Sequence, residues 1–396
     1  MIEYPNKLDI IFDKLQKYNI KPVIVGGYVR DYFFNKYEKS SKRLTKDIDI
    51  ELYNAESFEQ LQNILCEFGN PNLNGKNFGV IKLKVDDLDI DFSLPRTDNK
   101  VSSGHTGFEV DTYSDISFHK ASSRRDFTIN AIGFDIFNKK ILDPFGGLED
   151  LKQKKLKMVS QETFIEDPLR VLRAMQFCAR FELKPDYELI DAASKMCENN
   201  LLDELPRERI YEEFKKLFLK AKHISIGLNF LKDVNGFIYF SELNMSESDW
   251  HIKLKYIDSV DKTKLDNATN IAVVLALLCY KMEENAKQSF LNKIINKKTT
   301  LKTIDYLHHI DSYLESIDKK DFDNTLKYKI LKDIDTNTLK IYLEAKSISE
   351  DIIRKIYSIK PIVHGKDLMK SGFKPSKEFD SLLQMIYEVQ LLKLFN

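Results

Sequence analysis

Residues 21–31, KPVIVGGYVRD, contain the pattern that decides the fold of the N-terminal part. The apolar run 22–25 predicts a buried strand, and Gly26-Gly27 predicts a tight turn into a helix that carries Arg30. Backbone N–H groups in such a turn can approach an anion closely, and the helix N-terminus favours negative charge. The turn is therefore a candidate triphosphate site, although two glycines more often form a simple tight connection. Neither G-x-G-x-x-G nor G-x-x-x-x-G-K-[ST] occurs here, which argues against a dinucleotide-binding fold and a P-loop.

The run DIDIEL at 47–52 follows twenty residues later and has the alternation of a strand. Asp47 and Asp49 point to one face, while Ile48 and Ile50 point into the core. Two carboxylates on one face repel each other, and divalent cations relieve that repulsion. The pair suits two Mg²⁺ ions in an in-line phosphoryl transfer. A solvated strand edge is an alternative of equal weight at this point.

The run LDIDFSL at 88–94 offers a third carboxylate. Asp89 and Asp91 share one face of this strand-like segment. A two-metal nucleotidyl transfer needs a carboxylate beside the attacking hydroxyl, where a metal lowers the pKa of that hydroxyl. We expect Asp91 to take this place rather than Asp89.

The segment EDPLRVLRAMQF at 166–177 predicts a helix that begins near Pro168, with Asp167 as its N-cap. Arg170 and Arg173 follow at three-residue intervals, which places them with Asp167 along one side of the first turns. A carboxylate beside a guanidinium presents an acceptor and donors to the edge of a base. Cytosine and adenine each offer an amino donor next to a ring-nitrogen acceptor, whereas uracil and guanine offer a carbonyl next to a ring N–H. Such a pair would select C and A.

The chain as a whole reads as an α+β head followed by a long helical part. Its 396 residues are 43% apolar and 31% charged, with 14 Gly and 10 Pro, which excludes collagen-like and disordered classes. Strand patterns occur at 21–27, 47–52, 78–85, 88–94 and 131–143. After about Gly147 apolar residues recur at helical spacing, and strand signals nearly vanish.

Charge and cysteine content narrow the class of protein further. Sixty-one basic residues balance sixty-one acidic ones, so a nucleic-acid surface has to be a local patch. The four cysteines form no C-x-x-C pair, which indicates neither a disulfide framework nor a cysteine zinc site. The longest apolar run, 271–280, is too short to span a bilayer. We expect a cytoplasmic protein with no membrane partner; the sequence predicts no oligomeric state.

Five motifs in order resemble one family. GGYVRD, DIDIEL, RRDFTINAI, DPFGGLEDL and EDPLRVLRA, between about residues 20 and 180, closely resemble the class II tRNA nucleotidyltransferases, or CCA-adding enzymes, and their sister bacterial poly(A) polymerases. The segment 362–391 looks like the closing helical motif of the same family. The resemblance implies a polymerase-β-like nucleotidyltransferase head and an all-helical neck, body and tail. It places these domains at 1–146, 147–205, 206–360 and 361–396, the last of them binding tRNA.

The resemblance also implies a role for individual residues. Asp47, Asp49 and Asp91 match the family's catalytic, Mg²⁺-binding carboxylates, and Glu166 matches a residue that holds Arg170. The positions that match nucleotide-binding residues of the family are Gly26, Gly27, Arg30, Arg124, Arg125, Asp126, Asn130, Glu166, Asp167, Arg170 and Arg173. The partners implied are tRNA, ATP and CTP, with release of diphosphate. Residues 96–118 match a flexible loop that CC-only members lack, so we expect a terminal-A-competent enzyme.

Several other functions stay open. Poly(A) polymerases of the family tend to end in a long basic extension, whereas residues 361–396 hold five Lys against four acidic residues. That favours CCA addition over poly(A) polymerase, with A-only addition as a further alternative. A non-catalytic RNA-binding relative would be expected to lose a metal carboxylate, and an antibiotic-modifying nucleotidyltransferase would lack both EDPLR and the helical half.

Overall fold

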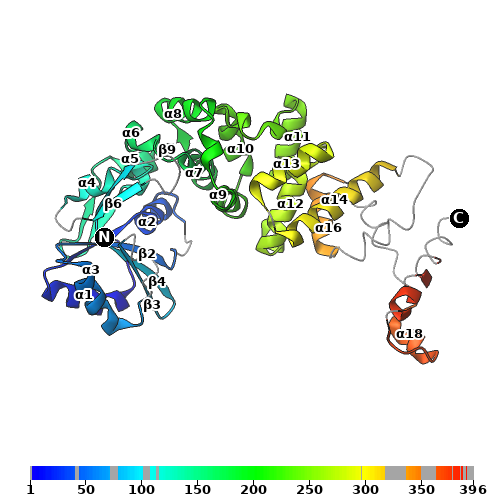
Figure 1. The fold of residues 1–396 in the computed structure, drawn as a ribbon, viewed down its shortest axis with the longest axis horizontal. Helices are drawn as coiled ribbons and strands as arrows, with labels where there is room; N and C mark the ends of the chain where they lie inside the picture. The colour runs from blue at the N-terminus through cyan, green and yellow to red at the C-terminus, as the bar shows by residue number, and fades with distance from the viewer. Residues whose placement is uncertain are drawn as a thin grey trace. The chain divides into compact units, whose positions relative to one another are not determined.

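The computed structural model describes most of the chain. It covers residues 2–40, 44–71, 79–100, 108–112, 116–295, 297–316, 336–348, 363–376, 378–383, 385, 386 and 389. The chain divides into two compact units, Met1–Ile210 with Ile226–Tyr239, and Tyr211–Ser225 with Phe240–Asn396. This division is coarser than the four domains expected from the sequence, which stay a prediction. The predicted α+β fold class is confirmed: a sheet-containing N-terminal part is followed by helices (Figure 1).

A six-stranded sheet forms the centre of the first unit, in the order β3-β4-β2-β1-β7-β8. Its strands are β1 (Lys21–Val25), β2 (Asp47–Tyr53), β3 (Val80–Val85), β4 (Leu88–Ser93), β7 (Gly133–Asp135) and β8 (Lys140–Leu142). The pair β2 and β4 is parallel, and the other neighbours are antiparallel. Every strand pattern predicted from the sequence is therefore confirmed, with the segment 131–143 forming two short strands.

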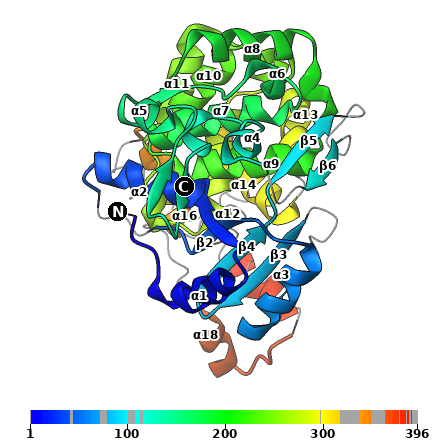
Figure 2. The ribbon, with the colours of Figure 1, turned by 90° about the vertical axis from the view of Figure 1, so that its left-hand side faces the viewer.

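The two faces of this sheet differ in chemistry. One face is apolar and packs against α1 (Asp9–Lys17) and α3 (Phe58–Leu65), which lie together beside the strands (Figure 2). Ile48 and Ile50 of β2 point into this core, as the alternation predicted. The opposite face carries the aspartates. Next to them, Val23 and Val25 pack with Ala121 of the short helix α4 (Phe118–Ser122).

The remaining elements of the first unit are mostly helical. They are α2 (Gly27–Tyr37), α5 (Gly147–Lys152), α6 (Gln161–Phe164), α7 (Leu169–Phe181), α8 (Tyr187–Glu198) and the 3-10 turn η4 (Thr128–Asn130). Two short strands, β9 (Lys155–Leu156) and β10 (Lys184–Pro185), pair in parallel. The division between the units falls within α9 (Arg207–Lys220) and α10 (Ile224–Asp233).

Two parts of the segment expected as a flexible loop form paired strands. Within residues 96–118, β5 (Arg96–Lys100) pairs antiparallel with β6 (Phe108–Thr112). Residues 101–107 and 113–115 lie outside the described residues. Most of the Gly, Ser and Thr cluster that suggested a loop therefore lies outside the described residues, and the pairing of the segments on either side was not expected.

Helices make up the second unit as far as it is described. They are α11 (Glu247–Asp258), α12 (Asn267–Cys279), α13 (Glu284–Ile294), α14 (Lys298–Ser316), α16 (Thr336–Ala345) and α18 (Gly365–Lys370). The apolar run 271–280 forms most of α12, and residues 270–279 are all buried because this helix is packed on every side. Among the described helices none is long and apolar enough to cross a membrane.

Candidate active site

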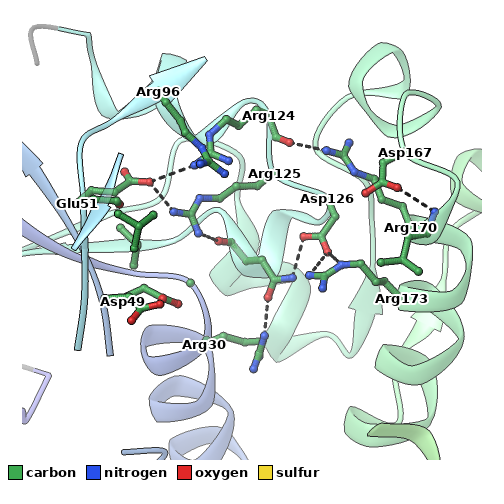
Figure 3. A pocket seen from close by; sticks show the side chains of 18 of the residues that line it. Arg30, Asp49, Glu51, Arg96, Arg124, Arg125, Asp126, Asp167, Arg170 and Arg173 are labelled. Atoms are coloured by element: carbon green, nitrogen blue, oxygen red, sulfur yellow. Dashed lines mark hydrogen bonds and ion pairs between the residues drawn. The ribbon is translucent and has the colours of Figure 1, made fainter. Parts of the chain in front are cut away.

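A pocket of about 440 Å³ opens on the face of the sheet that carries the aspartates (Figure 3). Its wall is strongly charged, with seven arginines and five carboxylates. These are Arg30, Arg96, Arg124, Arg125, Arg170, Arg173 and Arg209, and Asp49, Glu51, Asp91, Asp126 and Asp167. Gly26, Gly27 and Asn130 line it too. A concentration of guanidinium groups in one pocket suits a ligand with several negative charges.

The glycine turn closes one side of the pocket. Gly26 has φ 66° and ψ −126°, a conformation that residues with a Cβ rarely adopt. A Cβ at this position would lie 3.1 Å from Nη1 of Arg125 and 3.6 Å from Oδ2 of Asp49. The glycine therefore serves both the turn and the close packing of two pocket residues against it.

The aspartates lie in register across neighbouring strands. Asp49 of β2 stands opposite Asp91 of β4, while Asp47 stands opposite Asp89. Asp49 and Asp91 line the pocket, whereas Asp47 and Asp89 do not. Of the two aspartates of β4, the one expected at the site, Asp91, is thus the one that lines the pocket.

The electrostatics of Asp49 suit a bound cation. Desolvation by the surrounding protein raises the pKa of Asp49, Arg125 opposes this, and the negative charges of Asp91 and Glu51 add to it. Asp49 and Asp91 are oxygen donors of the kind that Mg²⁺ prefers. Within the described part of the chain, no three His, Cys, Asp or Glu side chains are gathered closely enough to hold a metal ion. The structure therefore brings together two of the three expected carboxylates, and Asp47 stays on the same strand outside the pocket.

Glu51 is a buried carboxylate that the sequence analysis did not single out. It is 1% exposed, and Oε1 lies 2.7 Å from Nη2 of Arg125 and 3.7 Å from Nη2 of Arg124. Its other oxygen accepts a hydrogen bond from the hydroxyl of Tyr53 at 2.8 Å. Burial opposes ionisation of Glu51, but the two arginines outweigh it and lower the pKa of the carboxyl. Glu51 thus holds Arg125 beneath the glycine turn.

A chain of polar contacts joins α2 to α7 through the segment 126–130. Nη1 of Arg30 donates to Oδ1 of Asn130 at 2.6 Å, and Nδ2 of Asn130 donates to Oδ1 of Asp126 at 2.9 Å. Oδ2 of Asp126 accepts from Nε and Nη2 of Arg173 at 2.6 and 2.5 Å (Figure 3). Burial raises the pKa of Asp126, but Arg173 above all, with Asn130 and Arg170, outweighs it, and the net pKa is lowered. These expected site residues therefore form one connected network.

The motif DPFGGLEDL supports this network from behind. Both carboxylate oxygens of Asp143 accept from backbone N–H groups at the start of α5, those of Gly147 and Leu148. Oδ2 of Asp150 accepts from the hydroxyl of Thr128 at 2.8 Å. The motif thus anchors the turn that carries Asn130. This structural role accounts for the motif without requiring that it contact a ligand.

Asp167 and Arg170 both line the pocket at the start of α7. Oδ1 of Asp167 accepts from the backbone N–H of Leu169 at 3.1 Å, so the predicted capping role is present. Asp167 also pairs with Nη2 of Arg209 at 3.0 Å. Arg170 donates to two backbone carbonyls, that of Arg124 at 2.7 Å and that of Thr163. The guanidinium of Arg170 is therefore held in place by backbone atoms.

Comparisons with known proteins agree with this geometry. A sequence profile for the poly(A) polymerase head domain matches residues 23–157. The multifunctional CCA protein of Neisseria meningitidis serogroup A is 34% identical over 193 residues, 49% of this chain and 42% of that protein. The CCA-adding enzyme of Buchnera aphidicola subsp. Baizongia pistaciae is 32% identical over 230 residues, 57% of this chain and 51% of that protein. Residues 23–157 thus match the poly(A) polymerase head domain, and the curated relatives that match about half of the chain are CCA-adding proteins.

Solved structures of CCA-adding enzymes share the fold. The apo form II of a CCA-adding enzyme has a TM-score of 0.73 at 19% identity and covers 98% of this chain and 92% of its own. The Thermotoga maritima CCA-adding enzyme complexed with tRNA has a TM-score of 0.72 at 18% identity, covering 98% of this chain and 92% of its own. At these identities the likeness establishes the fold. The matched segments span about half the length of the two curated relatives.

Most residues expected from the family resemblance meet in the pocket. Of the described residues that were expected at the site, Asp47 and Glu166 are the two that do not line it. The pocket also includes Glu51, Arg96 and Arg209, which were not expected as site residues. For Glu51 the signal was available, because alternation along β2 places it on the same face as Asp49. Arg209 follows Pro206 at a helix start, and nothing in that local pattern indicates a partner at Asp167.

Proposed function

We propose that this chain adds C and A nucleotides to the 3′ end of tRNA, using CTP and ATP and a divalent cation, without a nucleic-acid template. The observation that carries the proposal is the meeting of Asp49 and Asp91 with an arginine-rich wall and the Asp167–Arg170 helix start in one pocket. Relatives named multifunctional CCA protein and CCA-adding enzyme support the choice of reaction.

The triphosphate would lie between the glycine turn and the arginines. The N-terminus of α2 favours an anion next to Gly26 and Gly27. Arg125 and Arg173 are each paired with a buried carboxylate, Glu51 and Asp126, which fixes the direction of their guanidinium groups. Preorganised donors of this kind stabilise the charge that develops on the phosphate during transfer.

Asp49 and Asp91 would hold the cation, with Asp47 as the third ligand that the family resemblance implies. When bound, such cations neutralise the phosphate charge and lower the pKa of the attacking hydroxyl. In the proposed reaction the 3′ hydroxyl of the RNA loses its proton to water and its oxygen bonds to the α-phosphorus, while the bond from the α-phosphorus to the bridging oxygen breaks and diphosphate leaves. Asp91 would lie beside the attacking hydroxyl on the pocket face of the sheet.

Asp167 and Arg170 would select the base. Both project from the start of α7 into the same pocket, where Asp167 offers acceptors and Arg170 offers donors. Pairing of these groups with the amino group and ring nitrogen of C or A leaves them unpaired against U or G. Glu166 holding Arg170 stays a prediction, supported by the influence of its negative charge on Arg170.

Product sequencing tests the proposal. The protein is incubated with Mg²⁺, all four nucleoside triphosphates and a tRNA that ends at the discriminator base, and the 3′ ends are sequenced. CCA ends are expected. Addition of a single A, and only to tRNA ending in CC, would indicate an A-adding enzyme. Long A tails would indicate a poly(A) polymerase. No extension of any RNA would contradict the proposal.

Matched carboxylate variants test the cation site. Asp49→Ala and Asp91→Ala should abolish nucleotide addition and keep the fold, because the core contacts of β2 and β4 come from the opposite face. Asp89→Ala is the control, since Asp89 is on the same strand and face as Asp91 but outside the pocket. Asp47→Ala should also abolish addition if Asp47 is the third ligand. Wild-type turnover by Asp49→Ala or Asp91→Ala would contradict the assignment.

A further inference from the structure

Lys82 stands at the end of a row of charged side chains that crosses three strands. Lys82 of β3 is the register partner of Asp91 of β4, and Asp91 is the register partner of Asp49 of β2. The three side chains therefore share the pocket face of the sheet. Nζ of Lys82 lies 2.7 Å from Oδ2 of Asp91. A cation that is part of the chain thus already contacts one of the two carboxylates proposed to bind metal.

The lysine is free to move away from this contact. Its strand is the outer strand of the sheet as described, and the side chain of Lys82 is 56% exposed. Asp91 is more enclosed, with 34% of its side chain exposed. The ammonium group can therefore turn into solvent without disturbing the core, whereas Asp91 keeps its place.

A divalent cation bound by Asp49 and Asp91 would compete with Lys82. Both cations need the carboxylate oxygens of Asp91, and like charges a few ångströms apart repel each other. The neighbouring pair does not have this feature: Lys84 is opposite Asp89, two residues along the same strands, and makes no ion pair within the described part of the chain. Competition is thus confined to the row that contains Asp49 and Asp91.

We propose that Lys82 is a built-in counter-cation that holds Asp91 in the metal-free protein and is displaced when a divalent cation binds, so that it sets the affinity of the site for that cation. The inference rests on the proposed cation site of Asp49 and Asp91. Lys82 is a positioning residue in this role, because it acts through Asp91. Its presence makes cation binding weaker in the free protein and relieves the repulsion between the carboxylates until the cation arrives.

Mn²⁺ binding to the full chain without nucleotide tests this. Electron paramagnetic resonance of free Mn²⁺ gives the affinity directly, for the wild type and for Lys82→Gln, Lys82→Arg and Lys84→Gln. Lys82→Gln should bind Mn²⁺ roughly 3- to 10-fold more tightly, because one repelling charge is lost. Lys82→Arg keeps the charge and should stay near the wild type. Lys84→Gln, the matched control, should change the affinity by less than about twofold.

A double variant shows whether the effect passes through Asp91. Asp91→Asn should weaken Mn²⁺ binding, and adding Lys82→Gln to it should give no gain. Unchanged or weaker binding by Lys82→Gln, an equal gain in Lys84→Gln, or no Mn²⁺ binding by the wild type would each overturn the inference. The proposed reaction is judged separately by product sequencing. If tRNA is not extended but Mn²⁺ binding behaves as expected, the proposed function fails and the role of Lys82 stands.

Discussion

Asp167 has two contacts that bear on its proposed role in base selection. It caps α7 through the N–H of Leu169, and it pairs with Arg209, whose side chain is 32% exposed. A cap alone would make asparagine a nearly neutral replacement, since Asn caps about as well as Asp. The ion pair adds a modest structural contribution, about 0.2 to 1 kcal/mol for a pair of this exposure. Base selection is the proposed third role, and experiment can separate it from these two.

Asp167→Asn should reduce the preference for CTP and ATP over UTP. The substitution replaces an acceptor-only group with an amide that can also donate, which can satisfy the O4 carbonyl of uracil. The free energy of unfolding should fall by about 1 kcal/mol or less. Steady-state kcat/KM for the four nucleotides measures the change in selectivity. Unchanged discrimination against UTP would leave Asp167 as a cap and ion-pair residue.

Arg209→Gln is the matched control for that experiment. It removes the same ion pair but keeps the carboxylate of Asp167 and its cap on Leu169. Stability should fall by a similar amount, while discrimination against UTP should remain close to the wild type. Arg170→Ala, in contrast, should weaken the use of both CTP and ATP, because one guanidinium is proposed to serve both bases. An equal loss of selectivity in Arg209→Gln and Asp167→Asn would indicate displacement of the helix start instead of altered base pairing.

At the scale of an element, the start of α5 depends on two glycines for different reasons. Gly146 is in the left-handed region with φ 72°, and a Cβ there would meet nothing within 4 Å. Gly147 is outside the left-handed region, but a Cβ there would lie 2.1 Å from the carbonyl oxygen of Thr128. The segment that carries Thr128 and Asn130 thus leaves no room for a side chain at Gly147.

Gly147→Ala should therefore be far more harmful than Gly146→Ala. The clash forces η4 away from α5 and should cost about 3 kcal/mol or more, whereas the left-handed alanine at 146 should cost about 1 kcal/mol. Thermal unfolding followed by circular dichroism measures both. Because Asn130 moves with Thr128, Gly147→Ala should also raise KM for nucleotide. Equal destabilisation by the two variants would contradict the packing argument.

In the second unit, a buried ion pair fastens α16 to α14. Lys346 directly follows α16 and contacts Asp311 of α14, and both residues are less than 10% exposed. The hydroxyl of Tyr342, which is fully buried, donates to the other oxygen of Asp311. The buried carboxylate of Asp311 is compensated as long as the ammonium group of Lys346 is next to it.

Lys346→Met should destabilise the second unit by about 3 kcal/mol or more, because it leaves the carboxylate of Asp311 buried without its cation. Trp250, the single tryptophan, lies buried in α11 of the same unit, so its fluorescence in urea reports this unfolding. Lys340→Met is the control: its pair with Glu344 on the same helix is exposed and should contribute less than about 0.5 kcal/mol. A similar loss of unfolding free energy in both variants would contradict a stabilising role for the buried Lys346–Asp311 pair.

At the scale of the whole molecule, binding of tRNA would have to rely on local charge. The chain carries 61 basic and 61 acidic residues, but residues 119–180 hold twelve Lys and Arg against eight Asp and Glu. Within this segment Arg173 is paired with Asp126, and Arg125 with Glu51. Fewer cations are therefore available to phosphates than the count suggests.

The affinity for tRNA should fall with salt, with a slope that reflects a handful of phosphate contacts. Each contact contributes about −0.7 to −0.9 to the slope of log K against log salt concentration. A slope of about −2 to −5 is therefore expected from fluorescence anisotropy of labelled tRNA between low and moderate salt. An affinity independent of salt would contradict binding through a local basic surface.

Local patterns in the sequence determined the strands and the helical half, whereas most of the expected site residues came from the family resemblance. The alternation in DIDIEL placed Asp47 and Asp49 on the solvent face because strand side chains alternate with a period of two. The Gly26-Gly27 turn and the Asp167 cap followed from backbone preferences that act over a few residues. The pairing of β5 with β6 was not predicted, because the segment that contains both strands is rich in Gly, Ser and Thr, a composition typical of loops.

Only the tertiary structure decided which charges meet. Asp49 enters the pocket while Asp47, on the same strand face, does not, because the register and the elements around it set how far the pocket extends. Glu51 with Arg125, Asp126 with Arg173 and Asp167 with Arg209 join residues 42 to 74 positions apart. The sequence does not show which of these residues lie close together in space. The local backbone preferences of an acidic residue are the same whether its side chain pairs with a distant arginine or faces water. Burial makes these pairs necessary, because a charge that is removed from water is destabilising unless an opposite charge lies next to it in the folded structure.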